Sequence, residues 1–413
     1  MIAQNAVRRL RANGLALALS NGGGAALAFL LSALIGRSLG AQELGLYAAT
    51  LAWIYPLSLL AEAGLGTLLA QRVAQDAAQA QAYLIGSARL RLLLGGGLTL
   101  ALLVGAPLLS SDERLALGLR LSAPLVFIQS LYASFSGVWR GLEIMRPLAW
   151  LNLSMLSAQV VLVALALSLG GDVLLALALN TLTSAGQLVA AYVVHRRRYG
   201  PIRTAQTIPG MAALLRQSAS YAVAAVLAAL SSRLAFVLLE SLAGLEAVGL
   251  YSAAWRWWEA ARLLPFAYYD ALFPRLSSLA QDQLALQTTF RGAARLLALY
   301  GLLVTLVLAS LSNVLLRLSF GTDFVPAAVL LSTLAWGAPL SYLKSLRTLY
   351  WYALGQAAWV NRLTLLVLAL YGVALLLVVS SEEALGAAWA FVLTEGLACA
   401  ALWLYRPLVA RPS

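Results

Sequence analysis

The stretch that decides the fold is LAGLEAVGLYSAAWRWWEAARLLPFAYYDALFPRLSSLAQD, residues 242–282. It is long and apolar enough to cross a bilayer, which takes about 20 residues of helix. Four charged side chains nevertheless fall at membrane depth within it: Arg256, Glu259, Arg262 and Asp270. Because a charge inside lipid is costly and faces a partner or a watery cavity, this stretch predicts a membrane helix with a functional role.

The first half of the chain contains a counterpart of this stretch at residues 39–76. GLYAA at 45–49 recurs as GLYSA at 249–253, an offset of 204 residues, which is about half of the chain. Two more short segments recur in the same order. GSARL at 86–90 recurs as GAARL at 292–296, an offset of 206 residues, and Ala-Pro at 123–124 recurs at 338–339, an offset of 215 residues. These similar offsets predict an internal repeat.

The composition is that of an integral membrane protein. Hydrophobic residues make up 62% of the 413 residues, charged residues 11%, and the mean hydropathy is +0.85, whereas about a quarter of the residues of a soluble domain are charged. The single cysteine, Cys399, cannot form an intramolecular disulfide. Apolar runs near the ~20 residues that a bilayer requires predict twelve membrane helices, at about residues 14–36, 44–70, 83–109, 115–139, 147–169, 172–194, 217–239, 247–273, 293–316, 325–353, 359–380 and 384–405.

The arginines predict how these helices are oriented. With a cytoplasmic N-terminus, nineteen arginines fall at inner loops and helix ends, and three, Arg37, Arg114 and Arg317, fall at outer ones. This asymmetry is the positive-inside pattern of membrane proteins. It accounts for the net charge of +12 without a nucleic-acid partner, and it predicts that both termini face the cytoplasm.

The repeat and the helix count together predict the architecture. Because each half contributes an even number of helices, both halves begin on the same side of the membrane and form parallel repeats. We therefore expect an all-α integral membrane protein with twelve transmembrane helices in two parallel six-helix repeats around a central cavity. The expected domains are an N-terminal lobe at 1–194, a cytoplasmic basic linker at 195–216 and a C-terminal lobe at 217–413.

Three short motifs in the first half carry a family resemblance: GRSLG at 36–40, ELGLY at 43–47 and EAGL at 62–65. With VGLYSAAWRWWE and FPRLS in the second half, they resemble the bacterial polysaccharide (oligosaccharide-lipid) flippases. These belong to the multidrug, oligosaccharidyl-lipid and polysaccharide exporter superfamily. The family usually has aspartate where Glu62 stands here, so the charge is kept.

The resemblance implies a flippase that moves undecaprenyl-diphosphate-linked oligosaccharide across the bacterial cytoplasmic membrane by alternating access. Its product would serve cell-surface polysaccharide synthesis, such as O-antigen, capsule or exopolysaccharide. The implied partners are membrane lipid, the lipid-linked glycan and polysaccharide polymerase machinery, with no nucleic acid. No cofactor is expected, although coupling to a proton or sodium gradient is consistent with the acids at membrane depth.

Cations at membrane depth are the candidate binding residues for the anionic head group. Arginine pairs with phosphate oxygens through a planar fork and stays charged at any relevant pH. At 100° per residue, Arg256, Glu259 and Arg262 share one helix face, as do Lys344 and Arg347. The predicted substrate-binding residues are Arg233, Arg256, Arg262, Lys344 and Arg347, and the candidates for ion coupling are Glu62, Glu259 and Asp270.

Each candidate also has a structural interpretation. Arg256 and Glu259 are spaced to neutralise each other, Glu62 is equally suited to helix packing, and Glu395 is assigned a structural role. Arg120, near an outer helix end, is placed to extend to the interface. The polar residues of the fifth and sixth helices either face the sugar or join helices by hydrogen bonds; they are Asn152, Gln159, Asn180, Ser184 and Gln187.

An enzyme is the weakest functional class for this sequence. The chain has one histidine, and it shows no phosphate loop, metal-ligand cluster or plausible catalytic triad. The main alternative is a multidrug or small-solute antiporter of the same superfamily, which would favour an acidic cavity for cationic drugs. A membrane scaffold would not need cations at membrane depth.

Overall fold

The computed structural model describes residues 2–201 and 210–405 and, within them, contains helices and no strand. Residues 202–209 of the predicted linker lie outside the described part, as do Arg406 and Arg411 and the side chains of Arg8, Arg9 and Arg11. The chain divides into two compact units, Met1–Val237 and Leu238–Ser413. Each unit is described by itself below.

Ten helical stretches in the described residues are long and apolar enough to cross a membrane. Two of them contain a break with non-helical backbone, at Gly244 (φ 86°) and at Glu383 (φ 45°). Each break divides its stretch into two, so ten stretches become twelve spanning segments. This confirms the predicted fold class, a twelve-helix membrane protein built from two six-helix repeats.

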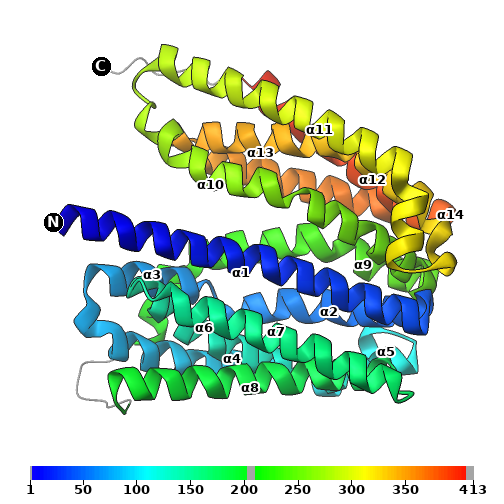
Figure 1. Cartoon of the computed structure of the whole chain (residues 1–413), viewed down its shortest axis with the longest axis horizontal. Helices are drawn as coiled ribbons and strands as arrows, with labels where there is room; N and C mark the ends of the chain where they lie inside the picture. Colours follow the sequence, from blue (N-terminus) through cyan, green and yellow to red (C-terminus); the bar gives the residue numbers. More distant parts are fainter. Residues whose placement is uncertain (1, 202–209, 406–413) are drawn as a thin grey trace. The chain divides into compact units, whose positions relative to one another are not determined.

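Within the first unit, the helices lie side by side, with α1 against α7, α4 against α6 and α7 against α8 (Figure 1). α9 begins in this unit and continues beyond its boundary at Val237. The helices are α1 (Ile2–Leu39), α2 (Ala41–Glu62), α3 (Leu65–Gln75), η1 (Ala77–Gln79), α4 (Ala80–Leu109), α5 (Glu113–Ser122), α6 (Pro124–Gly141), α7 (Met145–Ser168), α8 (Val173–Tyr199) and α9 (Met211–Ala261).

The second unit holds the end of α9 and the helices that follow it. Within it, α11 packs against α12 and α13, and α14 packs against α13. These helices are α10 (Leu263–Ser278), α11 (Gln283–Ser319), η2 (Thr322–Ala327), α12 (Ala328–Ala335), α13 (Gly337–Ala353) and α14 (Ala357–Leu404). The predicted lobe boundaries at 194, 195–216 and 217 stay a prediction.

Several predicted helices are interrupted where the repeat signatures lie. The second helix stops at Glu62, passes through Ala63 (φ 51°) and Gly64 (φ 66°) in left-handed conformation, and resumes as α3. Its counterpart breaks at Arg262 between α9 and α10. At Ala123-Pro124, α5 gives way to α6, because the proline lacks an N–H and crowds the preceding turn.

The two halves also share one close helix contact. A Cβ atom on Gly95 would lie 2.8 Å from Ser130 Oγ, and one on Gly301 would lie 2.7 Å from Pro339 Cα. Gly95 and Gly301 are separated by 206 residues, the same offset as GSARL and GAARL. In both halves glycine therefore lets the third helix approach the fourth closely, α4 against α6 and α11 against α13.

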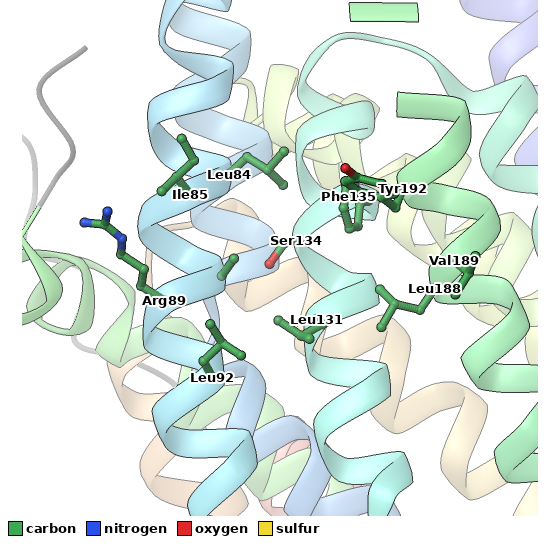
Figure 2. A pocket seen from close by; sticks show the side chains of 11 residues that line it. Leu84, Ile85, Arg89, Leu92, Leu131, Ser134, Phe135, Leu188, Val189 and Tyr192 are labelled. Carbon is green, nitrogen blue, oxygen red and sulfur yellow. The ribbon is translucent and has the colours of Figure 1, made fainter. Parts of the chain in front are cut away.

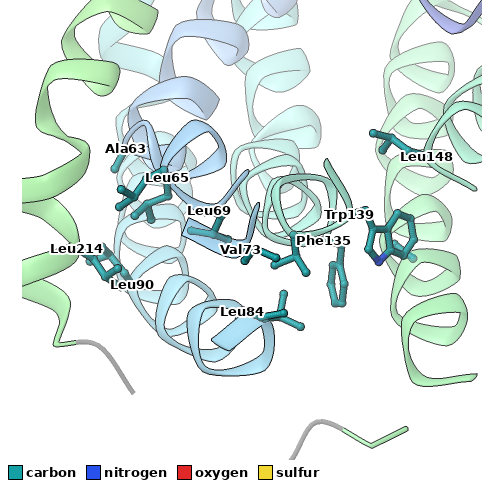
Figure 3. Close-up of a cluster of buried hydrophobic side chains, with 14 residues drawn as sticks. Ala63, Leu65, Leu69, Val73, Leu84, Leu90, Phe135, Trp139, Leu148 and Leu214 are labelled. Atoms are coloured by element: carbon teal, nitrogen blue, oxygen red, sulfur yellow. The ribbon is translucent and has the colours of Figure 1, made fainter. Parts of the chain in front are cut away.

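A hydrophobic core cluster of the first unit lies around α3 and α6 (Figure 3). Leu65, Leu69 and Val73 of α3 are buried in it with Phe135 and Trp139 of α6. The start of α9 joins this core through Leu214, and the backbone of α9 at Ala222 closes on Gly64, where any Cβ would collide. α3, the segment after the break, is thus held from two sides.

Candidate functional site

The predicted site residues fall into both units. Glu62 and Arg233 lie in the first unit, on α2 and on the first half of α9. The other six lie in the second unit, where each can be located against its neighbours: Arg256, Glu259, Arg262, Asp270, Lys344 and Arg347.

Arg256 and Glu259 form an ion pair on α9. The distance from Arg256 Nη1 to Glu259 Oε2 is 2.9 Å, and Trp255 Nε1 donates a hydrogen bond to Glu259 Oε1 at 3.1 Å. The spacing of three residues places both side chains on one helix face. The pairing predicted from the spacing is therefore present, and it orients Glu259 between two donors.

Lys344 also has an acidic partner, but on another helix. Its Nζ lies 2.5 Å from Oε1 of Glu395 on α14, and the side chains are 27% and 12% exposed. The sequence shows no acid near Lys344 on its own helix, so this pair depends on the packing of α13 against α14. Glu395 is thus the direct partner of a predicted site residue.

Arg347, one helical turn after Lys344 on α13, is surrounded by aromatic rings. Its guanidinium carbon is 4.6 Å from the ring centroids of both Tyr350 and Trp351, and 5.3 Å and 5.4 Å from those of Phe290 and Trp403. Its Nε donates a hydrogen bond to the Leu402 carbonyl oxygen at 3.2 Å. Aromatic faces attract a cation without neutralising it.

Arg262, at the break between α9 and α10, is held in a similar way. Its guanidinium carbon lies 4.7 Å from the Phe266 ring centroid and 6.0 Å from that of Trp258. Among the described residues, neither Arg262 nor Arg347 forms an ion pair with a carboxylate. Asp270 lies exposed on α10.

Arg233 lies over Tyr55 of α2, with 5.3 Å between its guanidinium carbon and the ring centroid. A second ring, Phe236, lies 5.6 Å away. Arg233 is therefore positioned by the first unit, while the other predicted cations belong to the second.

The structure adds a charged residue that the sequence interpretation left among the helix ends. Arg91 of α4 is completely buried, and its Nη2 lies 3.8 Å from Glu62 Oε1. Its Nη1 donates a hydrogen bond to Ser134 Oγ at 2.5 Å. The repeat contains a signal that could have singled out Arg91. The equivalent position in GAARLL, 206 residues later, is the apolar Leu297, so the charge occurs in only one of the two halves.

Two of the polar residues of α7 and α8, Asn152 and Gln187, join helices in this structure. Asn152 Oδ1 accepts hydrogen bonds from the Tyr132 hydroxyl at 2.6 Å and from Gln187 Nε2 at 2.8 Å. These three residues lie on α6, α7 and α8. Among the aromatic residues of α9, Trp258 is fully buried and stacks on Tyr342 with ring centroids 6.3 Å apart.

An apolar groove of about 480 Å³ opens between α4, α6 and α8 (Figure 2). Leu84, Leu131 and Leu188 contribute to its walls, and Arg89 contributes its stem while its guanidinium points away from the groove. Its volume lies in the range of small-ligand sites. Such a lining suits a hydrocarbon chain.

These features define a multi-pass, all-helical membrane protein with a two-repeat, twelve-helix fold. Over residues 10–280, the chain matches the family model described as Polysaccharide biosynthesis protein. It belongs to that family, which confirms the resemblance of the motifs at 36–65. No curated protein sequence matches the chain.

Solved structures with the same fold include transporters and a flippase. An inward-facing multidrug resistance MATE family transporter of the MOP superfamily is similar at 17% identity and a TM-score of 0.76, covering 94% of this chain and 92% of its own. The lipid II flippase MurJ, in an inward closed conformation, is similar at 13% identity and a TM-score of 0.72, covering 93% and 86%. A MOP superfamily transporter from Pyrococcus furiosus is described as having a binding pocket of reverse polarity. It is similar at 17% identity and a TM-score of 0.64, and the match covers 95% of this chain and 94% of its own.

Proposed function

We propose that the chain is an alternating-access flippase for an undecaprenyl-diphosphate-linked oligosaccharide. It moves this lipid from the cytoplasmic to the outer leaflet of the bacterial cytoplasmic membrane for the synthesis of a cell-surface polysaccharide. Membership of the polysaccharide biosynthesis family and the fold shared with a lipid II flippase support this proposal. The proposed partners are the membrane lipid, the lipid-linked glycan and polysaccharide polymerase machinery.

The observation that carries the proposal is a pair of cations that, within residues 2–201 and 210–405, form no ion pair with a carboxylate. Arg262 and Arg347 lie in segments long and apolar enough to span the membrane, against aromatic rings rather than acids. Arg256 pairs with Glu259, and Lys344 pairs with Glu395. The second unit therefore keeps positive charge at membrane depth, and a positive site lowers the cost of bringing a diphosphate into a low-dielectric region.

The remaining parts of the substrate meet different surfaces in this proposal. The hydrocarbon chain stays in the bilayer and lies along apolar walls such as the groove of α4, α6 and α8. The candidates for coupling to a proton or sodium gradient remain Glu62, Glu259 and Asp270. Of these, Glu259 already pairs with Arg256, and Glu62 lies beside Arg91.

The test is transport of a fluorescent polyprenyl-diphosphate oligosaccharide by the purified protein in lipid vesicles. A membrane-impermeant reductant then bleaches only the label that reaches the outer leaflet. We expect Arg262→Gln and Arg347→Gln to slow transport by about tenfold or more, because a charge-assisted hydrogen bond contributes ~1.5–3 kcal/mol. The matched control is Arg120→Gln, an exposed arginine whose Nε donates to the Leu103 carbonyl oxygen. Wild-type rates from both site variants would contradict the proposal.

The alternative is a multidrug or small-solute antiporter, which the similarity to MATE family transporters favours. The two functions differ in what the cavity must attract, since a cationic drug requires acids and a diphosphate requires cations. Overexpression in a bacterium that lacks its own flippase separates them. Drug resistance without restored glycan export would support the antiporter, whereas restored export that is lost in Arg233→Ala, Arg256→Ala or Lys344→Ala supports the flippase.

A further inference from the structure

The break between α2 and α3 brings together three charged side chains of the first unit, which we call the Glu62 cluster: Glu62, Arg91 and Arg140. Arg91 Nη2 lies 3.8 Å from Glu62 Oε1. The Glu62 carboxylate lies against Gly66, where a Cβ would collide with Oε1 and would lie 3.1 Å from Arg140 Nη2. The Glu62 carboxylate thus forms an ion pair with Arg91, and the Arg140 guanidinium lies on the far side of the same small space above Gly66. The cluster holds two guanidinium groups and one carboxylate.

Arg91 is the unusual member of the cluster. Its side chain is 0% exposed, yet within the described residues its Nε and Nη2 have no hydrogen-bond partner. Only Nη1 is bonded, to Ser134 Oγ. The 3.8 Å separation from Glu62 is too long for a hydrogen bond. A buried charge with unused donors is costly, so the folded state retains here a capacity to bind oxygen atoms.

The backbone of the break favours an anion at the same place. α3 begins at Leu65 after Gly64, and the first N–H groups of a helix point toward its N-terminal end, where they favour negative charge. The Glu62 carboxylate lies on this first turn because residue 66 is glycine. Two arginines and a helix N-terminus therefore lie near one carboxylate, and in this structure the chain itself supplies that anion.

The second half of the chain shows that the fold does not need these groups. By the offsets of 204, 206 and 215 residues, the equivalents of Glu62, Arg91 and Ser134 are Phe266, Leu297 and Leu349. Leu297 is 3% exposed, so an apolar side chain fills the equivalent buried position in α11. Helix packing in this fold therefore does not require polar side chains at these positions. We infer that their presence in the first half serves a function other than packing.

We propose that the Glu62 cluster is a second phosphate-binding site, in which the Glu62 carboxylate takes the place of the ligand phosphate until substrate arrives. When Glu62 moves away, Arg91 and Arg140 receive the oxygen atoms of a lipid-linked diphosphate, whose greater charge matches two guanidinium groups better than one carboxylate does. This inference rests on the proposed function for the identity of the lipid. Glu62 acts as an internal competitor. The apparent affinity for the diphosphate is therefore the intrinsic affinity multiplied by the fraction of time for which Glu62 leaves the arginines free.

The test is binding of farnesyl diphosphate to the purified full-length protein in detergent, with farnesol as the uncharged probe. We expect Glu62→Gln to tighten diphosphate binding by about tenfold, the change produced when a competitor that fills the site about nine-tenths of the time is removed. Arg140→Gln, an exposed position, should weaken binding by a similar factor in the Glu62→Gln background. Farnesol should bind equally to all of these variants.

A purely structural ion pair predicts the opposite sign. If Glu62→Gln weakens diphosphate binding or leaves it unchanged while the thermal unfolding midpoint stays near that of the wild type, the inference is overturned. Equal affinity for farnesol and farnesyl diphosphate would overturn it too. Should Arg91→Gln fail to fold, the double variant Arg91→Gln/Glu62→Gln removes both charges together and should lose the tightening.

The vesicle transport assay keeps this inference separate from the proposed function. If the wild type transports the lipid-linked oligosaccharide but Glu62→Gln binds no more tightly, only the role of the Glu62 cluster fails. If Glu62→Gln does bind more tightly while the wild type transports no lipid-linked oligosaccharide, the phosphate site stands and the flippase proposal fails.

Discussion

At the scale of single residues, the main finding is that most predicted cations already have neighbours that fix their position. Arg256 has Glu259, Lys344 has Glu395, and Arg347 has aromatic rings. Such contacts are compatible with substrate binding, because a membrane charge must be held while no substrate is present. They also mean that a single substitution can act through stability as well as through binding.

Lys344→Ala should reveal this double effect. It leaves Glu395 12% exposed and without its partner, which we expect to cost about 2 kcal/mol of unfolding free energy, less than the ~3–5 kcal/mol of a fully buried pair. The measurement is thermal unfolding of the detergent-purified protein for Lys344→Ala, Glu395→Ala and the double variant. Additive losses from the two single variants would show that the pair contributes nothing to stability.

At the scale of helices, glycine determines how closely the third helix of each half approaches the fourth. In α11, a Cβ at Gly301 would meet the backbone of Pro339 at 2.7 Å, and a backbone cannot move as a flexible side chain can. This contact is equivalent to that of Gly95 in α4, so the fold uses the same device twice.

Gly301→Ala should therefore lower the unfolding free energy by ~1–3 kcal/mol, the usual range for overpacking. Gly97→Ala is the matched control, since it also lies within a helix but has open space around the added methyl group. The control should be neutral or slightly stabilising, because alanine favours helix over glycine. An equal loss in both variants would show that helix propensity, and not the close contact, controls the effect.

At the scale of the whole molecule, the distribution of arginine predicts the orientation in the membrane. The chain contains one cysteine, so Cys399→Ser gives a cysteine-free background. In that background, Ser111→Cys lies in a predicted outer loop and Gln281→Cys in a predicted inner loop, both at exposed positions. In intact cells, an impermeant maleimide should label residue 111 and reach residue 281 only after permeabilisation. The reverse pattern would place both termini outside.

The sequence by itself determined the fold class and the repeat. Composition requires a bilayer-spanning chain, and three short matches at similar offsets require two related halves, which the twelve spanning segments and the paired glycines at 95 and 301 agree with. It also indicated the ion pair of Arg256 and Glu259 as one of two interpretations, because contacts three residues apart follow from helix geometry alone.

Only the tertiary structure decided which charges are partners across helices. Lys344 pairs with Glu395, which lies 51 residues further along the chain. Arg91 pairs with Glu62, which lies at a helix break. The hydrophobic periodicity of the sequence does not indicate that this break falls at Ala63 and Gly64. The stretch at 242–282 showed that its charges need partners, but not where those partners lie. Partners between helices depend on packing and rotation, which hydrophobic periodicity leaves open in a segment that is apolar on every side.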